Sequence, residues 1–347
     1  TLTATLQKLN PQVGDPAPVQ PACVVAGGGD AGAATERPQP ILRRPINAPS
    51  IDSAPAPVKF AVAQVLARVR RSNAAAAGGP TGHSYQTLRQ LLDEDDVPTA
   101  RVVDVLNLIA AGAVPAPIAH LLNGGRGVCV PKTDASVRPI VVGSVFLRLI
   151  GSLALHHNRE ACEDYFMGPQ AKGKQFGVGT RDGCSLMAAC IEAHLEANPG
   201  HIDISCDLSN AFNSFDRSAL WPTLQAKFPN MVRYIVMTYG EAAPVFFREG
   251  GVLTTILNSV GSRQGCSLGS FLMAVALQPI LQQLADEFDD VLVTAYCDDV
   301  HFTGAPARVV AAYARYSALT SSLLQNKLRP DKSEVYAPQV SEEALRA

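Results

Sequence analysis

The spacing of apolar residues predicts a chain rich in helices. Apolar side chains recur every three or four positions across residues 58–71, beside three arginines, which predicts a basic amphipathic helix. Its arginines either face solvent or contact RNA. With Ser84 as an N-cap and Pro98 ahead of a helix start, the pattern predicts further helices. These lie at residues 84–92, 100–111, 118–122, 145–165, 183–197, 217–228, 230–239, 268–286 and 306–326.

Alternation of apolar and polar residues predicts strands between these helices. Residues 201–207 place Ile202, Ile204 and Cys206 on one face and Asp207 on the other. Further strands are predicted at residues 127–131, 136–142, 245–248, 253–258, 291–295 and 300–303. The order of helices and strands predicts an α+β fold with an antiparallel central sheet.

Composition limits the class of protein. The chain of 347 residues is 47% hydrophobic, which is enough for a sizeable core. No apolar run reaches 18 residues, and the start lacks both Met and a signal-peptide pattern. We therefore expect a soluble intracellular protein, nuclear or cytoplasmic and not secreted, with no membrane partner, and the start is consistent with a fragment.

The cysteines support the same compartment. Eight of them are scattered without a Cys-x-x-Cys pair, and several sit in apolar runs. This pattern favours buried, reduced thiols over disulfides or a zinc site. The residues are Cys23, Cys129, Cys162, Cys184, Cys190, Cys206, Cys266 and Cys297.

Net charge alone argues against a nucleic-acid partner, but its distribution does not. The formal charge is −2, whereas proteins that bind nucleic acids usually have a basic excess. Residues 41–180 nevertheless hold 15 Lys and Arg against 10 Asp and Glu. An acidic site further along the chain would hide a basic segment in the total.

Two acidic sites end predicted strands about ninety residues apart in the sequence. Asp207 ends the first strand, while Asp298 and Asp299 follow the apolar strand 291–295 in a tight turn. An isolated Asp-Asp pair is more often an exposed turn. Carboxylates held together repel one another, however, and so favour a hard cation such as Mg²⁺. A pair of such ions would activate a primer 3′-hydroxyl and bind a triphosphate.

The residues around these carboxylates resemble a known family. Residues 206–213, Cys-Asp-Leu-Ser-Asn-Ala-Phe-Asn, resemble polymerase motif A of reverse transcriptases. Residues 295–300, Ala-Tyr-Cys-Asp-Asp-Val, resemble the Tyr-x-Asp-Asp motif C of that family. Between them, residues 262–270, Ser-Arg-Gln-Gly-Cys-Ser-Leu-Gly-Ser, are similar to motif B. The order and spacing of the three motifs also match.

Flanking segments extend the resemblance to residues 78–337. Residues 130–140 resemble the fingers motif, 175–179 the segment ahead of motif A, and 326–334 motif D. The elements before the fingers and the Ala-Phe-Asn of motif A are most like non-LTR retrotransposon polymerases. The resemblance implies the fingers and palm of a right-hand polymerase, with an antiparallel palm sheet packed on helices. About fifteen residues remain after motif D, too few for a thumb, which is therefore expected to be absent.

Four segments follow from composition and resemblance together. Residues 1–56 are rich in Pro, Ala and Gly, which predicts a disordered tail or linker. Residues 57–200 are predicted to form N-terminal helices and fingers, and residues 201–338 the palm. Residues 339–347 are a C-terminal stub.

The resemblance also implies roles for single residues. Asp207, Asp298 and Asp299 would be catalytic, with Lys332 as general acid toward the leaving pyrophosphate. Asp207, Leu208 and Asp298 would hold two Mg²⁺ ions, for which Mn²⁺ can substitute. The expected partners are an RNA template, a DNA or RNA primer and dNTPs. The expected substrate-binding residues are Lys132, Arg138, Phe212, Gln264, Gly265 and Tyr296.

Each upstream assignment has a plainer alternative. Lys132 and Arg138 lie on one predicted hairpin, where they either bind the triphosphate or are simply solvated. Phe212 either blocks a ribose 2′-hydroxyl or is a core aromatic. Gln264 and Gly265 either allow close approach to the base pair or only begin a helix.

Two downstream assignments have alternatives as well. Tyr296 packs beside the primer end or belongs to the core. Lys332 is favoured over Lys327 by the Lys-Ser-Glu pattern, but it also suits a surface turn. The pair His156 and His157 has no partner at metal-ligand spacing and is predicted to lie on a helix surface.

Three functions remain open at the level of the sequence. The first is an RNA-directed DNA polymerase. The second is an RNA-dependent RNA polymerase, against which Tyr296, Phe212 and the Gln264-Gly265 pair argue. The third is a domesticated, non-catalytic subunit that binds RNA or acts as a scaffold, which the acidic net charge and short C-terminal end favour. Retention of the Asp207, Asp298 and Asp299 carboxylates argues against a scaffold, which needs no metal ligands.

Overall fold

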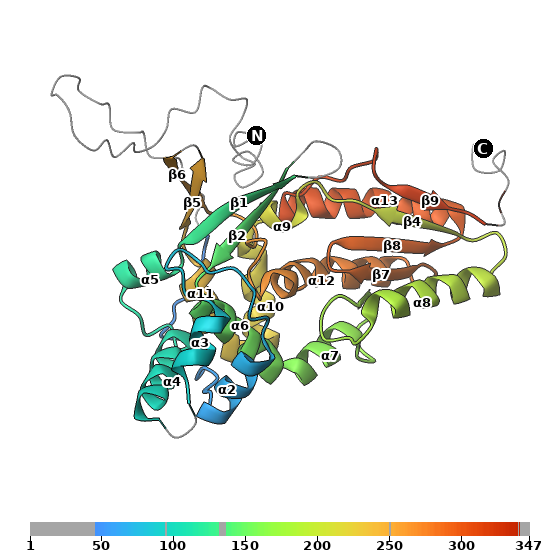
Figure 1. The fold of residues 1–347 in the computed structure, drawn as a ribbon. Coiled ribbons are helices and arrows are strands. Elements are labelled where there is room, and N and C mark those ends of the chain that lie inside the picture. Colours follow the sequence, from blue (N-terminus) through green and yellow to red (C-terminus); the bar gives the residue numbers. More distant parts are fainter. Residues whose placement is uncertain (1–45, 94–95, 132–136, 250, 339, 341–347) are drawn as a thin grey trace, which may run out of the picture. The chain divides into compact units, whose positions relative to one another are not determined.

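The computed structural model describes residues 46–93, 96–131, 137–249, 251–338 and 340. Contacts divide the chain into two compact units. The first unit comprises residues 1–153 and 233–267, and the second comprises residues 154–232 and 268–347. Each unit therefore combines segments that are distant in sequence (Figure 1).

The first unit contains a group of short helices. One face of α2 is buried through Val65, Leu66 and Val69. Arg89 on α3 donates hydrogen bonds to the carbonyls of Val69 and Arg70 at the end of α2, where the helix dipole favours a cation. The helices of this unit are α2 (Val62–Arg71), α3 (Tyr85–Leu91), α4 (Val97–Ala110), α5 (Ala116–Leu122), most of α6 (Val145–His157) and most of α11 (Val232–Tyr239).

A four-stranded sheet completes the first unit, with the order β2-β1-β5-β6. Its members are β1 (Gly125–Pro131), β2 (Val137–Gly143), β5 (Ala243–Glu249) and β6 (Val252–Asn258). The β1–β2 and β5–β6 pairs are antiparallel hairpins, and β1 runs parallel to β5. Val141, Val245 and Phe247 form a small core on this sheet.

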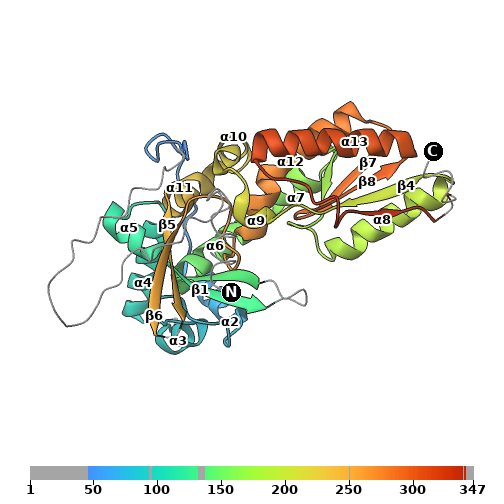
Figure 2. The ribbon, with the colours of Figure 1, turned by 90° about the horizontal axis from the view of Figure 1, so that it is seen from above.

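Helices α8, α12 and α13 pack against the sheet of the second unit (Figures 1 and 2). The 19-residue helix α12 is buried over most of its length. Phe271 on α12 packs edge-on against Phe166 and Phe228, with ring centroids 6.4 and 5.0 Å away. The helices are α7 (Arg159–Met167), α8 (Gly183–Ala197), α9 (Ala211–Ser214), α10 (Leu220–Lys227), α12 (Gly269–Glu287) and α13 (Pro306–Leu319).

The second sheet has five strands in the order β3-β7-β8-β4-β9. They are β3 (Lys174–Gln175), β4 (Ile202–Cys206), β7 (Leu292–Tyr296), β8 (Asp299–Gly304) and β9 (Glu334–Tyr336). All pairs except β3–β7 are antiparallel. Phe302 of β8 is fully buried and packs edge-on against Tyr316 of α13, with centroids 5.4 Å apart. The α+β prediction with an antiparallel sheet on helices is confirmed.

Most predicted helices and strands are present, and the differences have local causes. The predicted helix 145–165 is broken at Asn158, whose side-chain amide caps α6 by donating to the Ala154 carbonyl at 2.9 Å. The predicted helix 306–326 ends as α13 at Leu319, followed by a π-helical turn, Thr320–Leu324. Strands β3 and β9 have two and three residues, too few for alternation to be visible.

Three other expectations can be compared with the structure. Most of the predicted tail, residues 1–45, lies outside the described residues, whereas the carbonyls of Ala54 and Pro55 accept hydrogen bonds from Arg233. The expectation of buried cysteines fails at three exposed thiols, while Cys162, Cys206 and Cys297 are buried. The exposed thiols are those of Cys129, Cys184 and Cys190. Among the described helices, none combines the length and apolarity needed to cross a membrane.

Candidate catalytic site

Strand register in the second unit brings the predicted carboxylates to one edge of its sheet. Cys206 of β4 is opposite Val300 of β8, so the next residue, Asp207, lies across from Asp299. Burial raises the pKa of Asp299, a neighbouring charge on Asp207 raises it further, and His301 partly lowers it. Two carboxylates that are far apart in sequence therefore repel each other here.

The turn between β7 and β8 is tight because Tyr296 pairs directly with Asp299. Cys297 takes the left-handed conformation there, with φ of +57°. For a non-glycine residue this conformation costs roughly 1–2 kcal/mol. The fully buried Gln175 contacts this residue, with its Oε1 accepting from the Cys297 N–H at 2.7 Å and its Nε2 donating to the Cys297 carbonyl at 3.0 Å. The backbone beside Asp298 is thus held at both of its polar groups.

The segment resembling motif D pairs directly with the segment resembling motif A. Leu208 forms an antiparallel bridge with Leu328. Ser209 donates its N–H to the Lys327 carbonyl at 2.8 Å, and Arg329 donates its N–H to the Asp207 carbonyl at 2.8 Å. In this type of bridge the central residue directs its own N–H and C=O away from the partner strand. The Leu208 carbonyl therefore faces away from Leu328.

Residues 329–333 form a turn around the backbone of Asp207. The Ser333 hydroxyl accepts from the Asp207 N–H at 3.4 Å and donates to the Arg329 carbonyl at 3.0 Å. Asp331 binds the Arg329 guanidinium and raises the pKa of Arg329, with a smaller contribution from Asp207. Lys332 is exposed on the same turn. A cation near Asp207 is therefore also supplied by Arg329.

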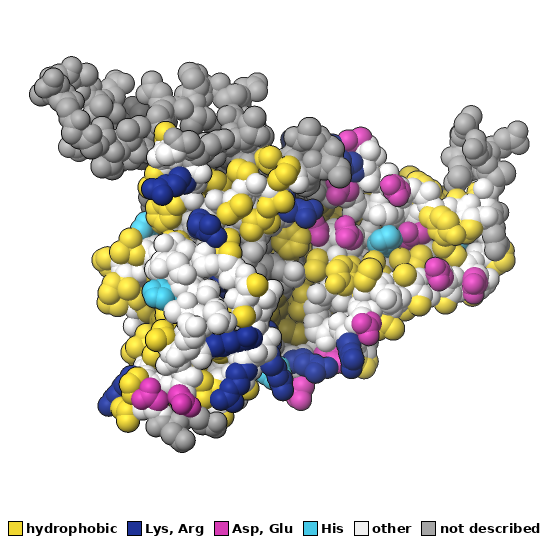
Figure 3. Space-filling view, in the orientation of Figure 1, with side chains coloured by type: hydrophobic (Ala, Val, Ile, Leu, Met, Phe, Trp, Pro, Cys, Tyr) yellow, Lys and Arg dark blue, Asp and Glu magenta, His cyan; other side chains and the backbone are white. Residues whose placement is uncertain are grey.

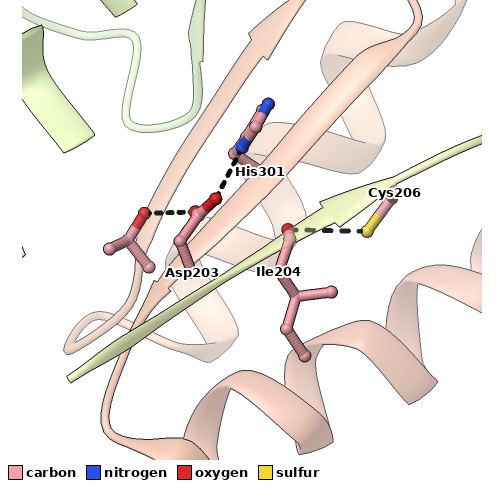
Figure 4. Close-up of polar contacts among 5 residues, drawn as sticks. Asp203, Ile204, Cys206 and His301 are labelled. Atoms are coloured by element: carbon pink, nitrogen blue, oxygen red, sulfur yellow. Dashed lines mark hydrogen bonds and ion pairs between the residues drawn. The ribbon is translucent and has the colours of Figure 1, made fainter. Parts of the chain in front are cut away.

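A buried carboxylate fixes the pairing of β4 with β8. Asp203 is 4% exposed and accepts hydrogen bonds from the Thr303 hydroxyl and the His301 Nδ1, both at 2.8 Å. Figure 4 shows Asp203 and His301 on one side of the strands and Ile204 on the other. These hydrogen bonds join β4 to two residues of β8 and so oppose a change of strand register.

The donor atoms at this edge fit a hard divalent cation. Asp207 and Asp298 offer carboxylate oxygens, and Leu208 offers a carbonyl oxygen. Among the described residues, no three or more His, Cys, Asp or Glu side chains are grouped to hold a metal. Mg²⁺ does not need such a group, because it commonly takes one or two carboxylates with waters and substrate phosphates.

Two aromatic residues predicted to contact substrate lie in the second unit. Phe212 is half-buried on α9, whereas Phe215 just beyond that helix is fully buried. Tyr296 is 36% exposed at the end of β7. Neither Phe212 nor Tyr296 is a fully buried core residue, which leaves part of each ring open to a substrate.

The remaining substrate residues lie in the first unit. Arg138 is exposed on β2, and Lys132 is outside the described residues. Gly265 has φ of +111°, and a Cβ there would lie 2.7 Å from the Val141 carbonyl. Val141 of β2 donates its N–H to the Gln264 carbonyl at 2.7 Å, so this loop docks against the strand that carries Arg138.

Arg263 holds the loop that contains Gln264 and Gly265 through contacts with two helices. It is 5% exposed and donates to the carbonyls of Asn123 and Thr238, at the C-terminal ends of α5 and α11. Its guanidinium also lies 4.8 Å from the centre of the Tyr239 ring. The negative ends of two helix dipoles and an aromatic face thus stabilise this buried cation.

Comparison with known proteins decides the family. The family model described as "Reverse transcriptase (RNA-dependent DNA polymerase)" matches residues 130–341. This match covers more than half of the chain. The chain belongs to the reverse transcriptase family.

One curated relative agrees with the retrotransposon resemblance. The chain is 26% identical over 249 residues to the retrotransposable element SLACS 132 kDa protein of Trypanosoma brucei gambiense. The match covers 71% of this chain and 20% of that protein, so the chain spans about a fifth of the relative's length. The prediction of a reverse transcriptase domain most like retrotransposon polymerases is confirmed.

Solved structures with a limited likeness include two telomerases. Apo telomerase of Candida tropicalis, truncated from the C-terminal domain, has a TM-score of 0.48 and 12% identity, covering 64% of this chain and 51% of that chain. Telomerase of Candida albicans in complex with a TWJ fragment of telomeric RNA has a TM-score of 0.48 and 13% identity, covering 66% of this chain and 44% of that chain.

Charge differs between the two units of this reverse transcriptase. The first unit holds 17 Lys and Arg against 12 Asp and Glu, and the second holds 12 against 19. Figure 3 shows acidic side chains on the visible face of the second unit, over the region of β4 and β8. The acidic total therefore comes from the unit that carries Asp207 and Asp298, as the charge distribution in the sequence had suggested.

Sequence reasoning missed three residues that hold the site together. Gln175 lies in a segment that was matched to the family but given no role. Arg329 and Ser333 lie in the segment that resembles motif D, in which the sequence predicted a role for Lys332 alone. The sequence did show that polar side chains lie inside segments that resemble family motifs. It did not show which backbone atoms they contact, because tertiary structure determines those contacts.

We predict that Asp203→Ala destabilises the protein more than the simultaneous replacement of Asp203 and Thr303 by valine does. The single change leaves the fully buried Thr303 hydroxyl unpaired, at a cost of about 1–3 kcal/mol. Thermal unfolding followed by circular dichroism should show a lower Tm for Asp203→Ala than for the double variant Asp203→Val/Thr303→Val. A double variant at least as unstable as Asp203→Ala would contradict this role.

We predict that Asp299→Asn raises the Tm at pH 7 in EDTA by about 1–3 °C, a small effect because the group is partly exposed. The folded-state pKa of Asp299 is raised, so its stabilising contribution is present at low pH and lost as the pH rises through that pKa. The advantage of Asn over Asp should therefore shrink as the pH falls below the ordinary pKa of Asp, about 3.9, where Asp becomes protonated in both states. Asp289→Asn, at an exposed position, is the control and should show no such trend.

Proposed function

We propose that the protein is an RNA-directed DNA polymerase that joins a dNTP to a primer 3′-hydroxyl on an RNA template. The observation that carries this proposal is the meeting of Asp207 with the Asp298-Asp299 turn at one sheet edge, in a chain of the reverse transcriptase family. We also infer a retroelement origin, because the curated relative is a retrotransposable element protein.

The chemistry proposed for the site depends on oxygen donors. Asp207, Leu208 and Asp298 would hold two Mg²⁺ ions, or Mn²⁺ in their place. Bound there, the ions would supply Lewis-acid activation of the 3′-hydroxyl and neutralise charge on the triphosphate. Ionised Asp299 would add negative charge that favours cation binding, and a bound cation would offset the burial and the Asp207 charge that raise its pKa. Lys332 would donate a proton to the leaving pyrophosphate.

Substrate selection is assigned to both units. Half-buried Phe212 would lie under the sugar and exclude a 2′-hydroxyl, while Tyr296 would pack beside the primer end. Arg138 and Lys132 would bind the triphosphate. Gln264 and Gly265 would approach the template or base pair. The Gln264 Oε1 supports this role, since it is buried without a hydrogen-bond partner among the described residues.

The proposed partners are an RNA template, a DNA or RNA primer and dNTPs. The basic excess of the first unit suits a nucleic-acid backbone, since phosphate contacts from Lys and Arg supply most sequence-independent affinity. We place the protein in the nucleus or cytoplasm, where its proposed template and nucleotides are found.

We predict that Asp207→Asn or Asp298→Asn lowers kcat by about a thousandfold or more, since losing metal-based charge stabilisation removes several kcal/mol from transition-state binding. The assay is primer extension on an RNA template with dNTPs and Mg²⁺. Asp289→Asn, which removes an exposed carboxylate of the same unit, should keep wild-type activity. Efficient extension by either active-site variant would refute the assignment, and an inactive wild type that binds RNA would favour the scaffold function.

We predict that Phe212→Val lowers the preference for dNTP over rNTP by about tenfold or more, in line with the discrimination that one close steric contact supplies. The measurement is the ratio of kcat/KM values for matched dNTP and rNTP on one primed template. Phe215→Leu changes a fully buried neighbour and should alter stability without changing this ratio. A wild-type preference for rNTP would instead indicate an RNA-dependent RNA polymerase.

A further inference from the structure

The most constrained backbone at the candidate site is that of Cys297. It is the first of two residues between the paired positions Tyr296 and Asp299, and its φ is +57°. Two-residue hairpins with a positive φ at this position normally use glycine, which has no Cβ to clash. The residue that follows is Asp298, the proposed metal ligand. An unfavourable conformation is therefore maintained immediately before a catalytic carboxylate.

One side chain contacts both polar groups of the Cys297 backbone. The Gln175 Oε1 accepts from the Cys297 N–H at 2.7 Å, and the Gln175 Nε2 donates to the Cys297 carbonyl at 3.0 Å. A primary amide is the one neutral side-chain group that presents a donor and an acceptor in this spacing. Gln175 has no solvent exposure, so water does not compete for these bonds.

Gln175 is itself fixed by the surrounding backbone. It lies on β3 opposite Ala295 of β7, and the next residue, Phe176, donates its N–H to the Ala295 carbonyl at 2.7 Å. The Gly177 N–H donates to the Gln175 Oε1 at 3.0 Å, which orients the amide. A Cβ on Gly177 would lie 2.4 Å from the Cys297 nitrogen, so the chain can approach the turn this closely only at a glycine.

We propose that Gln175 is a positioning residue that maintains the left-handed conformation of Cys297 and thereby aims the Asp298 carboxylate. Glycine at position 297 would adopt a positive φ without a steric penalty, whereas Cys297 is held there by the hydrogen bonds of the Gln175 amide. Gln175 does not contact substrate; it acts through the Cys297 backbone. The inference rests on the proposed function in one respect, since it takes Asp298 to be a metal ligand.

The test is whether glycine at position 297 removes the need for Gln175. Gln175→Met keeps the length of the side chain but loses both hydrogen bonds, and we expect kcat for dNTP incorporation to fall about 10- to 100-fold, as for other residues that support metal ligands. In a Cys297→Gly background the same change should lower kcat by no more than about threefold, because glycine adopts positive φ freely. KM for the primed template should change little in both backgrounds.

Cys297→Ala is the matched control for the loss of the thiol. Alanine keeps the Cβ and therefore keeps the conformational penalty, so Gln175→Met should cost as much kcat in this background as in the wild type. Gln170→Ala, at an exposed position of the same unit, should have no effect. A general loss of folding would lower activity equally in all three backgrounds and would refute the positioning role.

Mn²⁺ binding gives a readout that does not depend on catalysis. Titration followed by electron paramagnetic resonance should show about tenfold weaker Mn²⁺ binding for Gln175→Met, with affinity recovered in Gln175→Met/Cys297→Gly. Recovery of Mn²⁺ binding in a protein that incorporates no dNTP would support the positioning role and refute the polymerase function. An active wild type whose kcat and Mn²⁺ affinity do not change in Gln175→Met would refute the positioning role alone.

Discussion

Repulsion between carboxylates at one sheet edge is the constraint on which the second unit depends. Burial and the charge of Asp207 raise the pKa of Asp299, and Asp298 lies in the adjoining turn. Left to themselves, such groups would move apart or take up protons. The fold keeps the carboxylates from moving apart because hydrogen bonds hold the backbone beside Asp207 and Asp298. In the proposed function a hard cation would provide the remaining compensation.

Strand register is the means by which the carboxylates are held. A slip of one residue would turn Asp207 toward the apolar face that packs on helices. The buried Asp203 is hydrogen-bonded to His301 and Thr303. It opposes such a slip because another register would remove these partners and leave the buried carboxylate unpaired. The pairing of Leu208 with Leu328 adds a second restraint on the other side of the chain. The hydrogen bonds of Asp203 thus help to determine where Asp207 lies, although Asp203 itself is not proposed to bind a metal ion.

The sequence was sufficient for features that depend on local spacing. The helix at 183–197 and the alternation of Ile202, Ile204 and Cys206 follow from short-range periodicity, and both are present. The carboxylates were found because strand ends and tight turns leave a local signature. The break at Asn158 was missed because a single polar residue within an apolar helix pattern does not reveal that its side chain will cap the preceding turn.

Contacts between distant segments were beyond what periodicity can supply. Gln175 meets Cys297 across more than a hundred residues, and Ser333 meets Asp207 across a similar interval. Each contact joins a side chain to backbone atoms, and a backbone atom carries no residue-specific signal in the sequence. Lys332 was favoured by its match to a pattern, whereas the structure also places Arg329 beside Asp207, with its N–H donating to the Asp207 carbonyl.

The net charge of −2 shows how a whole-chain quantity can mislead about function. The first unit has an excess of five basic residues and the second an excess of seven acidic ones. A protein that binds both a polyanion and divalent cations needs each sign of charge in a different place. A scaffold would have use for the basic excess alone, because unpaired carboxylates near a phosphate backbone weaken its binding. The acidic excess lies in the unit that carries Asp207, Asp298 and Asp299, the residues proposed to hold or attract the metal ions.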